Sequence, residues 1–110
     1  MKTLTSLITI LFISLLSSPS FSETVSWDDL VERDELYYKK FSNTPFTGEI
    51  SGKKTGRFKA GKRQGEWLFY NENGQLLLLR SYKNGILNGL QNSYNGNGIE
   101  YSDNYQNGKL

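Results

Sequence analysis

The second half of the chain alternates short apolar stretches with corners that contain glycine. Asn-Gly pairs stand at Asn73-Gly74, Asn84-Gly85, Asn97-Gly98 and Asn107-Gly108. Such a pair is a strong signal for a tight β-hairpin, because a type I′ turn needs positive φ at both of its central residues. The stretches between these pairs are rich in leucine and aromatic residues. The pattern therefore predicts a meander of antiparallel strands.

The same pattern recurs at a longer period. Phe58-Lys59-Ala60-Gly61 recurs as Tyr82-Lys83-Asn84-Gly85 and again as Tyr105-Gln106-Asn107-Gly108, at intervals of about 24 residues. A fixed period of this size is typical of repeat proteins, whose units stack on their neighbours. We therefore predict a mainly β protein, in which a row of antiparallel β-hairpin repeats forms an elongated single-layer sheet. Its turn glycines are Gly61, Gly65, Gly74, Gly85, Gly89, Gly98 and Gly108.

Two-residue loops at the Asn-Gly pairs would assign the side chains to two faces, because side chains alternate along a strand. One face then carries a continuous apolar row, which we predict to be the core face: Leu68, Tyr70, Leu77, Leu79, Leu90, Tyr94, Tyr101 and Tyr105. The other face is apolar in one local patch only: Trp67, Phe69, Leu76, Leu78, Tyr82 and Leu87, with Arg80 opposite Trp67 in cation–π reach. A glycine bulge at Gly65 or Gly89 would shift the register by one residue and exchange the two faces.

The segment before the repeats is acidic and mixed. Ser26 and Asp29 have the spacing of a capping box, and the apolar residues that follow fit one helical face, so we predict a short helix at about 26–33. Residues 36–41 are rich in aromatic side chains and precede a turn-like stretch at 42–45. They are predicted to form a strand.

The first 22 residues have the composition of a secretory signal peptide. Lys2 gives a positive start, residues 4–16 are apolar, and small residues lead up to a cleavage site after Ser22. The alternative is an uncleaved membrane anchor, for which the apolar stretch is short, because a spanning helix needs about 20 residues. We predict export to the periplasm or the extracellular space. The organisation is then a signal peptide at 1–22, an acidic segment at 23–35 and a repeat domain at 36–110.

Composition limits the classes of partner and of stabilising element. The chain has 13 Lys and Arg against 11 Asp and Glu, so its net charge gives no reason to expect nucleic acid binding. It has no cysteine, which excludes disulfides and a lipoprotein signal. Stability must therefore come from the sheet, from stacking between repeats or from a partner.

The chain also lacks the residues on which most catalysis depends. It contains no histidine and no cysteine, which removes imidazole bases, thiol nucleophiles and the common zinc sites. An acidic cluster remains, and we interpret it as solvated charge: Asp28, Asp29, Glu32, Asp34 and Glu35. We expect no enzyme activity, no cofactor and no bound metal.

Two features of the sequence could bind a partner. The first is the apolar patch with Arg80, which either the N-terminal residues Trp27, Leu30 and Val31 or another chain, including a second copy, would have to cover. The second is a basic stretch that could dock on an anionic membrane or polymer or could simply be solvated edge charge: Lys53, Lys54, Arg57, Lys59, Lys62 and Arg63. We expect a protein partner, with the membrane surface as the secondary alternative.

Several of these motifs together resemble the MORN-repeat family. The matching segments are 46–49 (Phe-Thr-Gly-Glu), 61–70 (Gly-Lys-Arg-Gln-Gly-Glu-Trp-Leu-Phe-Tyr), 71–76 and 82–85, and the likeness is greatest to the short bacterial variant in YwqK-type antitoxins. Glu35 stands where that pattern usually has a turn glycine. The resemblance implies a row of β-hairpins that binds proteins or, in some members, membranes. It leads us to expect an exported binding protein with an antitoxin-like or immunity-like role.

Overall fold

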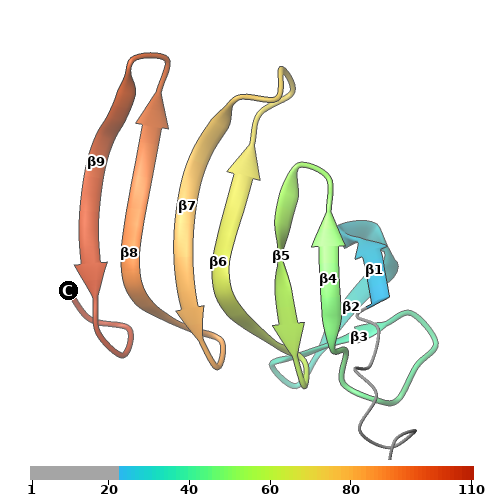
Figure 1. The fold of residues 1–110 in the computed structure, drawn as a ribbon. Helices are drawn as coiled ribbons and strands as arrows, with labels where there is room; N and C mark the ends of the chain where they lie inside the picture. The colour runs from blue at the N-terminus through green and yellow to red at the C-terminus, as the bar shows by residue number, and fades with distance from the viewer. Residues whose placement is uncertain (1–22) are drawn as a thin grey trace, which may run out of the picture.

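A computed structural model of the chain describes residues 23–110, and residues 1–22, for which a signal peptide was predicted, lie outside the described part. The protein is mainly β and is built on one seven-stranded sheet with the strand order β1-β4-β5-β6-β7-β8-β9 (Figure 1). The strands of this sheet are β1 (Glu23–Ser26), β4 (Gly48–Ser51), β5 (Lys54–Lys59), β6 (Lys62–Tyr70), β7 (Leu76–Lys83), β8 (Ile86–Asn95) and β9 (Gly98–Tyr105). From β4 to β9 each strand pairs antiparallel with the next, whereas β1 joins the edge of β4 in parallel.

The turns along one end of the sheet are held by the same hydrogen bonds. The amide of Gly61 donates to the carbonyl of Phe46 (2.8 Å), and that of Gly85 donates to Arg63 (2.9 Å). The amide of Gly108 donates to Leu87 (2.7 Å) in the same way. Each of these glycines has positive φ, as does the residue before it (Ala60, Asn84 and Asn107), which is the geometry expected of a primed turn. All seven predicted turn glycines have positive φ, although Gly65 and Gly89 lie inside strands β6 and β8.

The predicted helix at about 26–33 is wrong. A single 3-10 turn, η1 (Trp27–Asp29), is followed at once by strand β2 (Leu30–Arg33), which pairs with β3 (Leu36–Lys39). The Ser26 amide does donate to the Asp29 carboxylate, at 3.1 Å. A lone helix of two turns is marginal in water, because nucleation is unfavourable. The hairpin instead supplies each strand with backbone partners, and it buries Leu30.

The predicted strand at 36–41 is confirmed as β3, except that it ends at Lys39. Asp34 and Glu35 form the tight turn between β2 and β3, and both have positive φ, 50° and 67°. The boundary that we placed between residues 35 and 36 therefore lies within this turn. Beyond the strand, Phe41 also has positive φ and is fully exposed.

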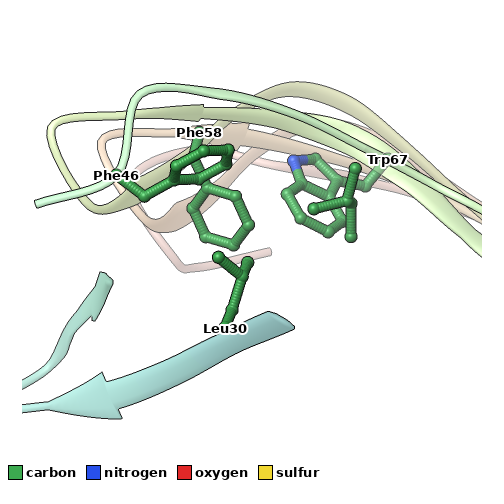
Figure 2. Close-up of a cluster of buried hydrophobic side chains, with 5 residues drawn as sticks. Leu30, Phe46, Phe58 and Trp67 are labelled. Carbon is green, nitrogen blue, oxygen red and sulfur yellow. The ribbon is translucent and has the colours of Figure 1, made fainter. Parts of the chain in front are cut away.

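The core lies between the sheet and the β2–β3 hairpin. Its buried residues come from both layers (Figure 2): Leu30, Phe46, Ile50, Phe58 and Trp67. Partly buried apolar residues pack around them: Val25, Trp27, Tyr37, Phe69 and Tyr82. The core face of the sheet is thus the face that carries Trp67.

The predicted core face is therefore wrong. Leu77, Leu90 and Tyr101 of the predicted row are 41%, 44% and 60% exposed. The Trp67 side is buried instead, because η1 and the β2–β3 hairpin bring Trp27, Leu30 and Tyr37 over it.

Strand register explains the rest of the error. Leu68 pairs with Leu79 as predicted, but irregularities follow at Tyr70, at Gly89 and at Tyr94. Asn95 pairs with Gly98, so the last hairpin loop is Gly96-Asn97 rather than Asn97-Gly98. The register shift between Ser93 and Tyr94 then places Tyr101 opposite Ser93, which moves Tyr101 and Tyr105 from the predicted row to the face of Trp67.

Candidate functional site

One face of the sheet has a covered half and an open half. In the covered half, formed by β4, β5 and β6, η1 and β2–β3 lie over the strands; in the open half, formed by β7, β8 and β9, no described element covers them (Figure 1). Two rows of paired residues run from the covered half into the open half. They are Trp67–Arg80–Gln91–Asp103 and Phe69–Leu78–Ser93–Tyr101. The first row changes from an aromatic residue to polar ones, whereas the second passes through Leu78 and Ser93 and ends in a tyrosine.

The covered half is an aromatic cluster. Phe58 stacks edge-on against Trp67, with ring centroids 5.0 Å apart, and Trp27 lies over the same indole at 6.4 Å. The indole N–H of Trp67 donates to the carbonyl of Arg57 at 3.1 Å, so its one polar atom is satisfied inside the core. Trp67 is 0% exposed and cannot contact a second chain without displacement of the hairpin.

Arg63 marks the border between the two halves. Its guanidinium lies 5.1–5.5 Å from the ring centroids of Trp27, Tyr37, Trp67 and Tyr82. It also donates a long hydrogen bond to the Tyr37 hydroxyl at 3.4 Å, while its Nε atom is buried without a partner among the described residues. A delocalised cation that faces several rings is attracted to each of them. Arg63 therefore ties the hairpin to the sheet rather than offering its charge to solvent.

The open half contains a shallow groove with a volume of about 180 Å³, which we call the open groove. Its apolar side chains come from three strands, and its polar ones alternate with them. The lining side chains on this face are Leu78, Arg80, Leu87, Gln91, Ser93, Tyr101, Asp103 and Tyr105. The combination of aliphatic and tyrosine side chains with a few polar groups is typical of protein-binding surfaces.

Polar groups give the open groove an acidic end at β9. A hydrogen bond to Asp103, and then the negative charge of that carboxylate, raise the pKa of Tyr101 above its usual value of 10.0. The amide nitrogen of Gln91 donates to the Ser81 carbonyl at 3.0 Å, whereas its oxygen is buried with no partner in residues 23–110. The sequence has no Lys or Arg from residue 84 to residue 108.

The opposite face of the same three strands has a different character. Asn92 is buried there, and it donates to the Tyr94 hydroxyl at 3.0 Å and accepts from the Ser102 hydroxyl at 2.7 Å. Outside this polar network, Leu77 and Leu90 are isolated exposed leucines on the same face. Such single exposed residues are common on protein surfaces.

The structure divides the predicted protein-binding residues among three places. Trp67 belongs to the core, and Phe69 and Tyr82 pack at the edge of the core. Leu78, Arg80 and Leu87 line the open groove, whereas Leu76 lies by a separate hollow next to Tyr94. Arg80 pairs with Trp67 in register as predicted, but its guanidinium lies over Phe69, at 5.8 Å.

Sequence reasoning missed five residues of the open groove, namely Gln91, Ser93, Tyr101, Asp103 and Tyr105. The two tyrosines had been placed on the other face by the loop at Asn97-Gly98. Asn95-Gly96 is an Asn-Gly pair as well, and the Asn95 side chain accepts from the Asn97 amide at 2.8 Å. The two adjacent pairs were the signal for an earlier loop, whereas the change of face comes from the register shift between Ser93 and Tyr94.

The predicted basic stretch does not form one surface. Lys54 lies over the Trp27 ring at 4.1 Å and Arg63 lies among the aromatic rings, both on the core side of the sheet. Lys53 forms an exposed ion pair with Glu72. The remaining charges, Arg57, Lys59 and Lys62, point to the opposite face, where Glu49 and Glu66 accompany them.

The acidic cluster near the N-terminus is exposed, as expected of solvated charge. Glu32, Asp34 and Glu35 line a cavity of about 590 Å³ beside Lys62 and Arg63, so charges of both signs face it. Within residues 23–110, no three His, Cys, Asp or Glu side chains are grouped as metal ligands would be.

In the part that the structure describes, no helix is long and apolar enough to cross a membrane. Comparison with models of protein families, with curated proteins and with solved structures found no match for this chain.

Proposed function

We propose that this chain is a non-enzymatic protein that binds another protein through the open groove. The observation that carries the proposal is the contrast within a single sheet face. On this face β4 to β6 are apolar and lie under the chain's own hairpin, whereas β7 to β9 continue the face with no cover from residues 23–110. Leu78, Leu87, Tyr101 and Tyr105 supply apolar area there, and Arg80, Gln91 and Asp103 supply polar contacts. Tyrosine and arginine are the residue types in which binding energy at protein interfaces concentrates.

We infer that strands β4 to β9 are a row of hairpin repeats of the MORN type. The recurrent glycine hydrogen bonds of Gly61, Gly85 and Gly108 support this, as does the spacing of the bulge glycines Gly65 and Gly89. A repeat sheet presents an extended surface, which suits protein binding better than catalysis. The family resemblance favours an antitoxin-like or immunity-like role.

The anionic-surface alternative has little support. A membrane or polymer would need several basic side chains on one exposed face. Here Lys54 and Arg63 face aromatic rings, and Lys53 is paired with Glu72.

Export is part of the proposal. Cleavage after Ser22 would remove residues 1–22, which have the composition of a secretory signal peptide. Immunity would then act against a toxin in the cell envelope. N-terminal sequencing of the protein from the exported fraction is expected to begin at Glu23, and a chain that begins at Met1 in the cytoplasm would overturn this part.

A crosslinking experiment in cells tests the function. A photoreactive residue at Leu87, in the open groove, is expected to crosslink to one partner, and the same residue at Ile86, which is 51% exposed on the other face, is not. Leu78→Asp should abolish the crosslink, whereas Leu77→Asp, its neighbour on the opposite face, should retain it.

The same partner should stay bound in about 0.5 M salt, because apolar contacts are screened far less than exposed charges. Equal crosslinking from both positions, or equal loss with both aspartates, would contradict a groove-specific partner. Loss of the crosslink in salt alone would favour electrostatic docking.

A further inference from the structure

Strand β9 forms an open edge of the sheet. It is the last strand in the order, it is eight residues long, and most of its residues are exposed. An edge strand presents unpaired N–H and C=O groups that can pair with another chain, and proteins usually block such edges with proline, lysine or a cover. β9 contains neither proline nor lysine, and no described element lies beyond it in the sheet (Figure 1).

The turn after β9 has the same construction as the turn that leads from β7 into β8. The Asn84 amide donates to the Gln64 side chain (2.6 Å), and the Asn107 amide donates to the Asn88 side chain (3.0 Å). After the first turn, Ile86 pairs with Lys83 and opens strand β8. After the second turn, Lys109 bridges to Gln106 in the same way. Within residues 23–110, β9 pairs with β8 on one side, and no strand pairs with its other side.

The chemistry of β9 indicates which strand would fit there. Arg80 of β7 pairs with Gln91 of β8, and the residue of β9 in the same row is Asp103. Asp103 and Glu100 are the charged residues of β9, and the region from 84 to 108 has no basic residue to balance them. A strand added at this edge would meet a carboxylate at Asp103, between the rings of Tyr101 and Tyr105. Opposite charges across neighbouring strands stabilise a pair, and like charges destabilise it.

This charge disfavours a second copy as the occupant. Pairing of β9 with β9 of another copy would bring the carboxylates of both strands together along one short edge. A foreign strand with a lysine or arginine is complementary instead, and its aliphatic residues could pack on the two tyrosines.

We propose that β9 binds its protein partner by strand addition: an extended segment pairs antiparallel with β9 and places a basic side chain against Asp103. This proposal rests on the proposed function, because it specifies how the partner of the open groove is held. Main-chain hydrogen bonds provide the affinity in this mode, and alternate side chains provide the specificity.

A synthetic peptide tests the proposal on the purified full chain. The probe is a capped peptide of about nine residues, a usual strand length, in which valine and threonine alternate around a central lysine. Amide NMR signals of β9 are expected to shift, and every second β9 amide is expected to exchange more slowly. A peptide with a central glutamate should bind about tenfold more weakly, because an attraction at the edge becomes a repulsion.

Two kinds of variant separate strand addition from simple charge attraction. Asp103→Lys should reverse the preference between the lysine and the glutamate peptide, and Glu66→Lys, on an inner strand, should leave it unchanged. Peptides that are N-methylated at alternate residues keep all their side chains. Methylation of the amides that face β9 should abolish binding, and methylation of the amides that face away should not, because only alternate amides of an added strand face β9.

Three outcomes would overturn the proposal: equal binding of both N-methylated peptides, shifts confined to β4–β6, and a concentration-dependent dimer held through β9. The absence of any shift in β9 would do so too. If the crosslink from Leu87 persisted in that case, the open groove would still bind a partner, without strand addition. The two proposals can therefore fail separately.

Discussion

The covered and open halves of the sheet face are built from similar strands but are completed in different ways. In the covered half, Phe58 and Trp67 are 0% exposed, because η1 and β2–β3 lie on them. In the open half, Tyr101 is 60% exposed, and the rows that begin at Trp67 and Phe69 end in Asp103 and Tyr101. The face is aromatic where the chain covers it and amphipathic where it does not. An uncovered sheet face that still carries leucine and tyrosine is the feature that calls for a partner.

Glycines also have different roles in the covered and the open half. A Cβ at Gly56, in the covered half, would overlap the indole ring of Trp67, so this glycine lets a large side chain lie flat on the backbone. Gly74, Gly96 and Gly98 of the open half have no atom within 4 Å of a Cβ placed there. Their role is in the turns, whereas the role of Gly56 is in packing.

Truncation of an aromatic side chain should give the largest difference in stability loss between the covered and the open half. Phe58→Ala is expected to lower the free energy of unfolding by about 3–5 kcal/mol, through lost burial and a cavity under Trp27 and Trp67. Tyr101→Ala should cost less than about 1 kcal/mol, since that ring is largely in solvent. Urea unfolding followed by tryptophan fluorescence measures both. Equal losses would mean that the open half is as tightly packed as the covered half.

A methyl group added to a glycine gives the second contrast. Gly56→Ala is expected to cost about 1–3 kcal/mol, because the Trp67 indole must move off the backbone. Gly96→Ala is the matched control: it has open space and no positive φ, so the change should be neutral or slightly stabilising. Thermal unfolding of the two variants checks this. A neutral Gly56→Ala would show that the indole does not need this glycine.

The sequence predicted the strands more reliably than their faces. Alternation of leucines and aromatics with Asn-Gly corners was enough to place β6, β7 and β8, and the Leu68–Leu79 pair follows from it. The faces depend on register, and each bulge changes the register without a unique signal. Asn88-Gly89 lies inside β8, and the overlapping pairs Asn95-Gly96 and Asn97-Gly98 permit two loops that differ by one residue. Local turn chemistry could not choose between them.

The N-terminal segment was misread for a related reason. The spacing of Trp27, Leu30 and Val31 fits a helical face, and that spacing fits a 3-10 turn followed by a strand equally well. What decides the outcome is the tertiary contact of Leu30 with Phe58 and its neighbours, which local pattern does not contain. The N-terminal segment was one of the predicted covers for the apolar patch. It covers Trp67, but it does not cover Leu78 or Leu87. The part of the candidate site formed by Leu78, Arg80 and Leu87 could thus be found from the sequence, and the part that contains the tyrosines and Asp103 could not.

The turn of the covering hairpin offers a smaller, stabilising change. Glu35 has φ of 67°, a conformation that costs a residue with a Cβ about 1 kcal/mol and glycine almost nothing. Glu35→Gly is expected to stabilise the protein by up to about 1 kcal/mol, less the entropy that glycine adds to the unfolded chain. Glu32→Gly, in strand β2 of the same hairpin, should destabilise it by about 0.5–1 kcal/mol. Urea titrations of both variants measure the difference in stability. A loss of stability with Glu35→Gly would contradict the inference that the backbone at Glu35 is strained.

The smallest effect concerns the acidic end of the open half. Asp103 holds the pKa of Tyr101 above 10.0 by a hydrogen bond and by its negative charge, both of which favour the neutral phenol. Asp103→Asn should therefore lower the pKa of Tyr101 toward that value, as seen in a tyrosinate absorbance or NMR titration, and Asp28→Asn, far from β9, should not. Because the folded-state pKa is the higher one, the stabilising contribution is complete below pH 10 and disappears as the pH rises through the folded-state value. A pKa of Tyr101 that did not respond to Asp103→Asn would remove the acidic end of the open groove, on which a basic strand at β9 depends.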